Sequence, residues 1–250
     1  MKQIIFTFLF LSLGLTNAQN IQETFAEANQ LYQQENYKQA IEKYHAILND
    51  DQVSSTLYYN LANSYYQTHQ IAESIYFYEK ALKLDPKNED AQQNLTIVQK
   101  SIIDQIDEVP KTSFERFRIA YLSKLHYNTW AYLSTIFVLL ATLLWVVFFF
   151  VFQSNRKKVL FSLSLLLSML ALGVLGVTYQ QYSFEKNNHF AIVFSERVEV
   201  KSAPRNSASE VFTLHLGTKV QLIDQAGEWN KIKIADGQIG WAKVAAVKEI

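Results

Sequence analysis

Two long stretches without a charged side chain constrain this 250-residue chain more than any other feature. Residues 129–152 form one stretch of 24 residues and residues 159–179 another of 21, and neither contains Asp, Glu, Lys or Arg. A helix needs about 20 apolar residues to cross the hydrocarbon core of a bilayer, and neither stretch has the polar face of a surface helix. The pattern predicts two transmembrane helices. The alternative, a buried helix pair in a soluble protein, would need a larger shell than this chain offers.

The residues that flank the two stretches are typical of a membrane hairpin. Aromatic residues that favour the headgroup region stand near the outer ends: Tyr127, Trp130, Tyr132, Tyr179 and Tyr182. The link over residues 153–158 is too short for a domain, and it contains Arg156, Lys157 and Lys158. Because cations favour the cytoplasmic side, we expect this link to be a cytoplasmic loop.

The first residues are typical of a secretory signal peptide. Lys2 precedes an apolar run over residues 4–15, and Thr16 and Ala18 supply small residues before polar Gln19. The pattern predicts a signal peptide over residues 1–18 that is cleaved after Ala18, with an uncleaved anchor as the alternative. A cleaved signal and a cytoplasmic link together place both flanking parts of the chain on the periplasmic side of the inner (cytoplasmic) membrane.

One feature opposes that orientation. The juxtamembrane linker, residues 109–128, carries four cations against Glu115, which gives it a net charge of +3 on the exported side. These cations are Lys111, Arg116, Arg118 and Lys124. Cations close to a transmembrane helix usually favour the cytoplasm. The signal peptide fixes the first translocation event, so we give it precedence.

A repeat of 34 residues organises the segment before the linker. Residues 21–54 align with residues 55–88, and small residues fall where paired helices touch closely: Ala28, Ala40, Ala62 and Ala81. This period resembles tetratricopeptide repeats, in which each repeat is a pair of antiparallel helices. We expect a repeat domain over residues 19–108 that ends in a capping helix over residues 89–106. Since about three repeats are normally needed for a continuous core, a partner or a further cap is implied.

The resemblance to tetratricopeptide repeats implies a peptide-binding groove lined by the first helix of each repeat. The groove positions carried over from the family are Phe25, Asn29, Tyr32, Gln33, Tyr59, Asn63, Tyr66, Gln67, Gln93, Ile97 and Lys100. Asn side chains both donate and accept hydrogen bonds, which suits them to a peptide backbone, and Tyr side chains offer large contact area. The alternative is that these residues only pack and solvate the helices.

Short alternating runs separated by turn residues fill residues 190–250. About five strands at this spacing predict a small β-barrel. The order resembles bacterial SH3-like domains through Val200 to Pro204, Leu214 to Gly217, Gly227 to Trp229, and Gly240-Trp241. Trp229 and Trp241 are a candidate ligand platform, although a Trp in so small a barrel is more often part of the core. The resemblance implies a domain that binds cell-wall peptide or protein.

Charge and composition exclude several classes of function. The chain has 23 basic and 23 acidic residues, and residues 19–108 carry 6 Lys against 14 acidic residues, so it lacks the basic face that nucleic acid requires. It has no Cys, which excludes disulfides, thiolate zinc sites and a Cys nucleophile. Its five His have no metal-ligand spacing, and no phosphate loop or nucleophile motif is present. We therefore expect no catalytic residue, metal or cofactor, and no enzyme activity.

The order of these parts predicts a multi-domain fold: an all-α tetratricopeptide solenoid, a transmembrane helical hairpin and a small all-β SH3-like barrel. This order resembles BatE-type proteins of bacterial aerotolerance operons. The resemblance implies a membrane-anchored adaptor that acts with von Willebrand factor A-type Bat proteins and a MoxR-type ATPase in oxygen tolerance or envelope stress. Two other classes stay open: a tether that binds peptidoglycan through the SH3-like domain, and a regulator of a transport machine with cytoplasmic repeats.

Overall fold

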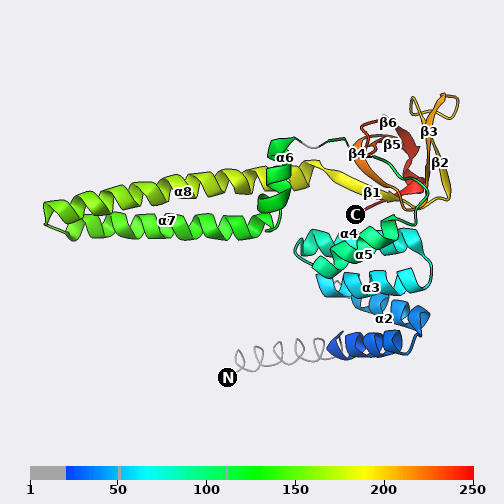
Figure 1. Cartoon of the computed structure of the whole chain (residues 1–250), viewed down its shortest axis with the longest axis horizontal. Helices are drawn as coiled ribbons and strands as arrows, with labels where there is room; N and C mark the ends of the chain where they lie inside the picture. Colours follow the sequence, from blue (N-terminus) through cyan, green and yellow to red (C-terminus); the bar gives the residue numbers. More distant parts are fainter. Residues whose placement is uncertain (1–20, 50–51, 108, 111) are drawn as a thin grey trace, which may run out of the picture. The chain divides into compact units, whose positions relative to one another are not determined.

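A computed structural model describes residues 21–49, 52–107, 109–110 and 112–250, and it divides the chain into two compact units (Figure 1). The first unit combines the residues up to Val109 with Phe190–Ile250, and the second is Pro110–His189. The predicted signal peptide, residues 1–18, lies outside the described residues. Residues far apart in the sequence therefore share the first unit, whereas the second unit is one continuous segment.

Helices with a 34-residue period make up the first half of the first unit. Residues 21–33 and α2 (Tyr37–Asn49) form one antiparallel pair, and α3 (Ser55–Gln67) and α4 (Ile71–Leu84) form the next. The tight corner inside each pair repeats as well, because Glu35 and His69, which are 34 residues apart, both have positive φ, of 63° and 59°. Such a left-handed residue ends a helix and lets the chain reverse. The sequence period is therefore also a backbone period.

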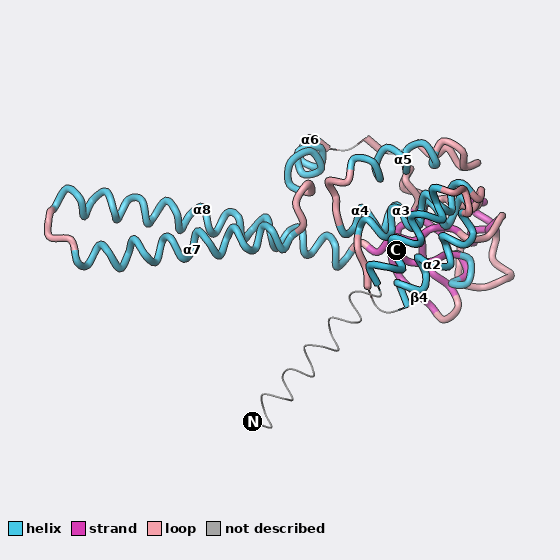
Figure 2. The backbone as a smooth tube through the Cα atoms, turned by 90° about the horizontal axis from the view of Figure 1, so that it is seen from below, coloured by secondary structure: helices cyan, strands magenta, loops and turns pink. Residues whose placement is uncertain are grey.

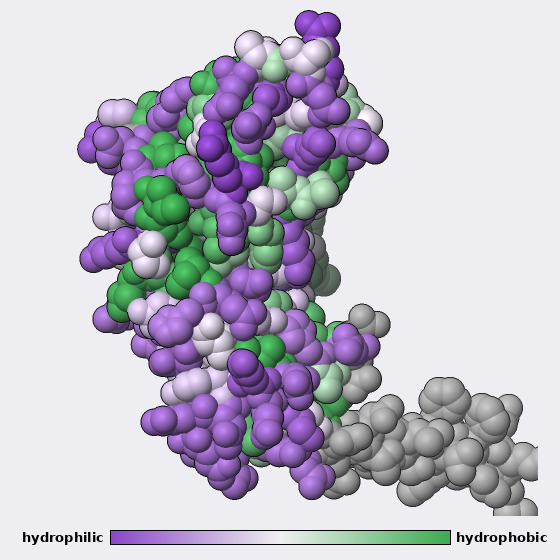
Figure 3. Space-filling view, turned by 90° about the vertical axis from the view of Figure 1, so that its right-hand side faces the viewer, coloured by the Kyte–Doolittle hydropathy of each residue, from purple (hydrophilic) through white to green (hydrophobic). Residues whose placement is uncertain are grey.

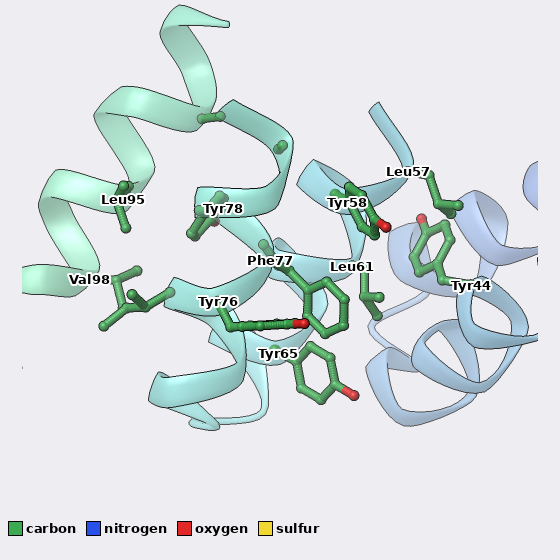
Figure 4. Close-up of a cluster of buried hydrophobic side chains, with 14 of the residues drawn as sticks. Tyr44, Leu57, Tyr58, Leu61, Tyr65, Tyr76, Phe77, Tyr78, Leu95 and Val98 are labelled. Atoms are coloured by element: carbon green, nitrogen blue, oxygen red, sulfur yellow. The ribbon is translucent and has the colours of Figure 1, made fainter. Parts of the chain in front are cut away.

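Small and large side chains alternate in the core of these helices. The four alanines named above, Ala28, Ala40, Ala62 and Ala81, are fully buried, which lets the helix backbones approach closely. Aromatic side chains fill the wider gaps, and the rings of Tyr65 and Phe77 stack with their centroids 5.5 Å apart (Figure 4). Close packing of this kind fixes the angle between successive helices.

Local signals set the helix ends. The Ser54 side chain accepts a hydrogen bond from Leu57 N at the start of α3, and Asn88 caps Ala91 N in the same way at the start of α5 (Glu89–Gln99). Helix α5 ends at Gln99, so the structure corrects the predicted capping helix over residues 89–106. Residues 102–107 are not helical, and alternate side chains are half-buried and exposed, which is the pattern of an extended segment.

The second half of the first unit is a seven-stranded antiparallel sheet. Its strands are β1 (His189–Val193), β2 (Arg197–Lys201), β3 (Glu210–His215), β4 (Lys219–Ala226), β5 (Trp229–Lys233), β6 (Ile239–Lys243) and β7 (Val247–Glu249). They are ordered β3-β2-β6-β5-β4-β1-β7. Strands β2 and β6 pair only through Lys201 and Trp241. A Cβ at Gly240 would lie 2.4 Å from Val200 Cγ1, so the Gly-Trp motif permits the close approach of these strands.

The second unit is a helical hairpin preceded by a short helical segment (Figure 2). The segment consists of α6 (Ser113–Phe117) and a π-helical turn, η1 (Arg118–Leu122), and the hairpin consists of α7 (Tyr127–Phe150) and α8 (Ser154–Asn187). The two long helices pack along their length, and Ser134 Oγ donates to the Ala171 carbonyl at 3.1 Å where small residues meet. Both helices are long and apolar enough to cross a membrane.

The helix ends of the hairpin differ from the expected boundaries. Helix α8 begins at Ser154, so all but the first residue of the predicted loop over residues 153–158 lie in its first turns. The chain reverses instead at residues 151–153. Arg and Lys are good helix formers, so Arg156, Lys157 and Lys158 belong to the first turns of α8 rather than to a loop. Helix α8 also continues past Tyr179 to Asn187, beyond the apolar stretch.

Candidate interaction surfaces

Two equivalent hydrogen-bonded clusters join successive helices of the repeat domain. Asn29 Oδ1 accepts hydrogen bonds from the Tyr44 hydroxyl at 2.7 Å and from Asn60 Nδ2 at 2.9 Å. The same cluster recurs 34 residues later, where Asn63 Oδ1 accepts from the Tyr78 hydroxyl and from Asn94 Nδ2. We call these two clusters the Tyr–Asn ladder. Each one ties the two helices of a repeat to the first helix that follows.

Burial controls the ionisation of the ladder tyrosines. Removal from water raises the pKa of Tyr44 to about 12, although its hydrogen bonding with Asn60 acts in the opposite direction. Burial raises the pKa of Tyr78 as well, against the effect of Asn94. Both hydroxyls are therefore neutral donors at physiological pH, which the geometry of the ladder requires.

The predicted groove residues divide into packed and exposed groups. Asn29 and Asn63 already use their side-chain oxygens in the ladder, and Phe25, Tyr32 and Tyr59 are half-buried against neighbouring rings at centroid distances of 5.9, 5.2 and 6.1 Å. Six other positions are exposed: Gln33, Tyr66, Gln67, Gln93, Ile97 and Lys100. The exposed group is the part of the predicted groove that is available to a ligand, and the binding role of the groove stays a prediction.

A carboxylate that no pattern in the sequence indicates joins the repeat domain to the barrel. Asp104 Oδ2 accepts from His215 N at 2.6 Å and from Thr218 Oγ1 at 2.6 Å, while Asp104 Oδ1 lies 2.7 Å from His215 Nδ1. The Asp104 side chain is only 11% exposed. Burial raises its pKa, but the hydrogen bonds from Thr218 and His215 outweigh that effect and hold the pKa below the usual value.

Apolar contacts continue the same junction. Ile192, Phe194, Leu216 and Ile250 from the barrel pack against the buried cluster of the helices, and Ile106 from the helical side packs against the core of the barrel. The backbone approaches the helical side closely at Gly217, because a Cβ there would lie 2.8 Å from Ile102 Cγ2. Each domain thus has its own buried cluster, and apolar side chains of each pack against the cluster of the other at the junction. The barrel covers the end of the repeats and supplies the cap that two and a half repeats lack.

Charged side chains surround this apolar contact. Lys219 Nζ lies 2.7 Å from Glu79 Oε2, Lys83 Nζ donates to the Ile250 carbonyl at 2.9 Å, and Lys248 Nζ lies 4.4 Å from the centre of the Tyr76 ring. On the face of the molecule drawn in Figure 3, hydrophilic side chains predominate and smaller apolar areas lie between them. The junction is an apolar contact with charged side chains at its edge, between two domains of one chain.

The two predicted platform residues of the barrel lie near each other in the sheet. Trp229 and Trp241 are half-buried on adjacent strands, and a lysine lies 5.9 Å from each indole: Lys243 over Trp229 and Lys231 over Trp241. Each tryptophan therefore contributes to packing and keeps part of its ring accessible. Their role in ligand binding stays a prediction.

Within the described part of the chain, no group of three or more His, Asp or Glu side chains is placed to hold a metal ion. His45 illustrates how the histidines are used. Its Nε2 lies 2.7 Å from the Tyr65 hydroxyl. Burial lowers the pKa of His45, and the positive charge of Lys248 lowers it to a smaller extent. Its surroundings are packed aromatic rings, so this histidine supports the fold.

Comparisons with known proteins agree with this architecture. Residues 55–88 match the tetratricopeptide repeat family model, and residues 196–248 match the bacterial SH3 domain model. Over 88 residues the chain is 34% identical to Sperm-associated antigen 1 of Rattus norvegicus, an alignment that covers 35% of this chain and 10% of that protein. The chain thus spans about a tenth of the length of this curated relative.

Two solved structures show only distant likeness. NlpC2 from Trichomonas vaginalis is 10% identical over 25% of each chain, with a TM-score of 0.24. The C-terminal SH3 domain of Myosin IB from Entamoeba histolytica is 19% identical over 26% of this chain and 95% of that one, with a TM-score of 0.19. TM-scores this low do not establish a common fold.

The predicted fold class is confirmed. The chain has a helical region with a tetratricopeptide repeat, two long apolar helices, and an antiparallel all-β domain that resembles SH3. Both kinds of domain are typically non-catalytic binding modules. The domain content therefore supports an adaptor or tether, the class of function that the sequence predicts.

Proposed function

We propose that this chain is a membrane-anchored adaptor of the cell envelope that assembles protein partners on its repeat domain. The observation that carries the proposal is the packed and hydrogen-bonded junction between the repeats and the barrel. Because the Asp104 carboxylate and the apolar junction join the two domains, a partner on either domain is held by the same packed unit. An adaptor needs such a unit, since fixed geometry raises the effective concentration of one ligand for the other.

The apolar hairpin supports the membrane anchor. Only 11% of the most apolar part of each long helix is buried inside the protein. The core helix of a soluble domain buries most of its apolar side chains, whereas a transmembrane helix presents them to lipid. We propose that the hairpin spans the inner membrane and that the repeats and the barrel both lie on the periplasmic side.

The BatE-type order of domains supports a particular set of partners. We propose that the exposed part of the groove, including Tyr66, Gln67 and Lys100, binds von Willebrand factor A-type Bat proteins in a complex with a MoxR-type ATPase. Such a complex would serve oxygen tolerance or envelope stress. Exposed Tyr and amide side chains favour an apolar or amide-rich peptide segment on the partner.

Crosslinking in intact cells tests this proposal. A photoreactive amino acid at Gln67, on the exposed face of α3, is compared with the same group at Lys38, which is exposed on α2. We expect covalent capture of a von Willebrand factor A-type protein from Gln67 and not from Lys38. Equal capture from both positions, or capture of no such protein from Gln67, would contradict the proposed assembly.

The match to a bacterial SH3 domain favours a second function, a tether to peptidoglycan. The accessible parts of Trp229 and Trp241 are the candidate contact. Sedimentation of the detergent-solubilised full chain with purified cell wall tests it. The full chain is used because the barrel packs against the repeats. Strong co-sedimentation that is lost in Trp241→Ala supports the tether, and its absence supports the adaptor.

A further inference from the structure

The segment just before the hairpin carries an exposed aromatic face. We call residues 113–124, which contain α6 and η1, the juxtamembrane segment. The exposed fractions of Phe114, Phe117 and Tyr121 are 60%, 50% and 66%. They are spaced by three and four residues, so they share one side of the segment, and the rings of Phe117 and Tyr121 lie 5.2 Å apart.

Contacts to the hairpin hold this segment at one end of the two long helices. Trp130 Nε1 donates to the Leu122 carbonyl at 3.0 Å, and the Arg118 guanidinium lies 4.0 Å from the centre of the Phe184 ring. Tyr127 and Tyr182 form a ring pair at the same end, with centroids 5.6 Å apart. The segment is therefore fixed at the end of the hairpin where amphipathic rings gather.

Cations accompany the aromatic face. Arg116 and Lys124 are exposed, while the opposing charges at this end are Glu115, half-buried in α6, and Glu185, which lies 3.7 Å from His126. Exposed aromatic rings beside Arg and Lys are the composition of helices that lie in the plane of a bilayer surface. Phosphate groups of lipids supply the complementary negative charge.

We propose that the juxtamembrane segment is an interfacial anchor that lies in the headgroup layer of the same bilayer, with Phe114, Phe117 and Tyr121 inserted toward the acyl chains. Arg116 and Lys124 bind the phosphate groups of anionic lipids. The proposal rests on the hairpin being membrane-spanning, as proposed above. Continuity decides in favour of lipid as the occupant, because only four residues, 123–126, separate η1 from the first apolar helix.

Site-specific labelling of the full chain in phospholipid nanodiscs tests this inference. The chain contains no Cys, so one introduced Cys carries an environment-sensitive fluorophore without background. Phe117→Cys is the test position, and Tyr121→Cys repeats it independently. Leu139→Cys, in the middle of α7, reports the hydrocarbon, and Ile239→Cys, exposed on the barrel, reports water.

We expect blue-shifted emission and quenching by nitroxide-labelled lipids at Phe117→Cys and at Leu139→Cys. The label at Ile239→Cys should show neither the blue shift nor the quenching. A label at position 117 in water beside a lipid-quenched label at 139 overturns the interfacial anchor and leaves the transmembrane hairpin intact. A blue-shifted label at 117 that nitroxide lipids do not quench also overturns it, since the segment then packs on protein. A label at 139 in water overturns the membrane anchor itself.

Lipid composition tests the role of the cations. The blue shift at Phe117→Cys should grow when phosphatidylglycerol replaces part of the phosphatidylcholine, and this dependence should disappear in the double variant Arg116→Gln with Lys124→Gln. Lys233→Gln, an exposed change on the barrel, is the matched control and should keep the dependence. Equal emission in the two lipid compositions overturns the assignment of these cations to lipid phosphates.

Discussion

Replacement of Asp104 by Ala should loosen the junction between the repeats and the barrel. The carboxylate accepts hydrogen bonds from His215 N and Thr218 Oγ1 and pairs with the His215 ring, all within 2.7 Å. Removing it leaves a backbone N–H and a hydroxyl without their acceptor in a partly buried place. Such donors cost free energy when they are left unpaired.

The size of the effect follows from these contacts. A hydrogen bond to a charged group contributes about 1.5–3 kcal/mol, and the Asp104 side chain is only 11% exposed. Water replaces part of the lost interaction, so we expect about 2–4 kcal/mol for the whole cluster. A loss of about 3 kcal/mol corresponds to roughly a hundredfold change in an opening equilibrium. Amide hydrogen exchange of His215 should accelerate by that factor.

Exchange measured by mass spectrometry on the full chain in nanodiscs checks this expectation. Asp107→Ala removes an exposed carboxylate three residues away and should leave the exchange of the peptide around His215 unchanged. Asp104→Asn keeps one acceptor oxygen but loses the charge, so its effect should fall between the two. If Asp104→Ala exchanges no faster than Asp107→Ala, the carboxylate does not hold the junction.

The depressed pKa of Asp104 fixes the pH dependence of this contribution. Burial raises the pKa of Asp104, but the hydrogen bonds from Thr218 and His215 together lower it by more than burial raises it. The folded protein therefore favours the ionised carboxylate. The stabilisation is therefore fully present above the unfolded-state pKa of about 3.9 and is lost as the pH falls through the folded-state pKa. The difference in stability between the parent chain and Asp104→Ala should shrink as the pH falls below about 4.

Three further outcomes test the packing of the first unit. Gly217→Ala should destabilise it by clearly more than Gly227→Ala in thermal unfolding, because both glycines have positive φ but only the Cβ at 217 would meet Ile102 and Ile75; equal effects would refute a tight junction. Tyr44 should titrate near pH 12 in an ultraviolet titration, and stability should fall as the pH rises from about 10 toward that value, because the raised pKa favours the neutral hydroxyl; titration near pH 10 would contradict its burial in the ladder. Asn63→Ala should cost about 1–3 kcal/mol by leaving two donors unpaired, whereas exposed Gln93→Ala should cost little, and similar melting temperatures for the two would argue against the ladder.

Much of the candidate site was readable because it repeats. The 34-residue offset aligns Asn29 with Asn63 and Tyr44 with Tyr78, and the structure places both pairs in equivalent clusters. The sequence did not reveal that these Asn oxygens face inward to neighbouring helices. Helical spacing identifies a face, but it does not say whether a polar side chain on that face bonds to the protein or to a ligand.

The capping helix over residues 89–106 shows a different kind of error. Its first part has helical periodicity and an Asn88 cap, and it forms α5 as expected. After Gln99 the side chains of Ile102, Asp104 and Ile106 alternate with exposed ones. Each of the three lies against the barrel: Ile102 beside Gly217, Asp104 at His215, and Ile106 on the barrel core. So short an alternating run is a weak local signal, and its extended form depends on a domain more than a hundred residues away in the sequence.

Periodicity and hydrophobicity along the chain determined three properties of this protein: a 34-residue helical repeat, two apolar helices of membrane-spanning length, and a small all-β module at the end. These properties are local, because each depends on residues that are near one another in the sequence. The tertiary structure alone decided that the barrel closes the end of the repeats. That contact joins Asp104 to Thr218 and Glu79 to Lys219, and no local pattern reports which distant surfaces gain most by excluding water together.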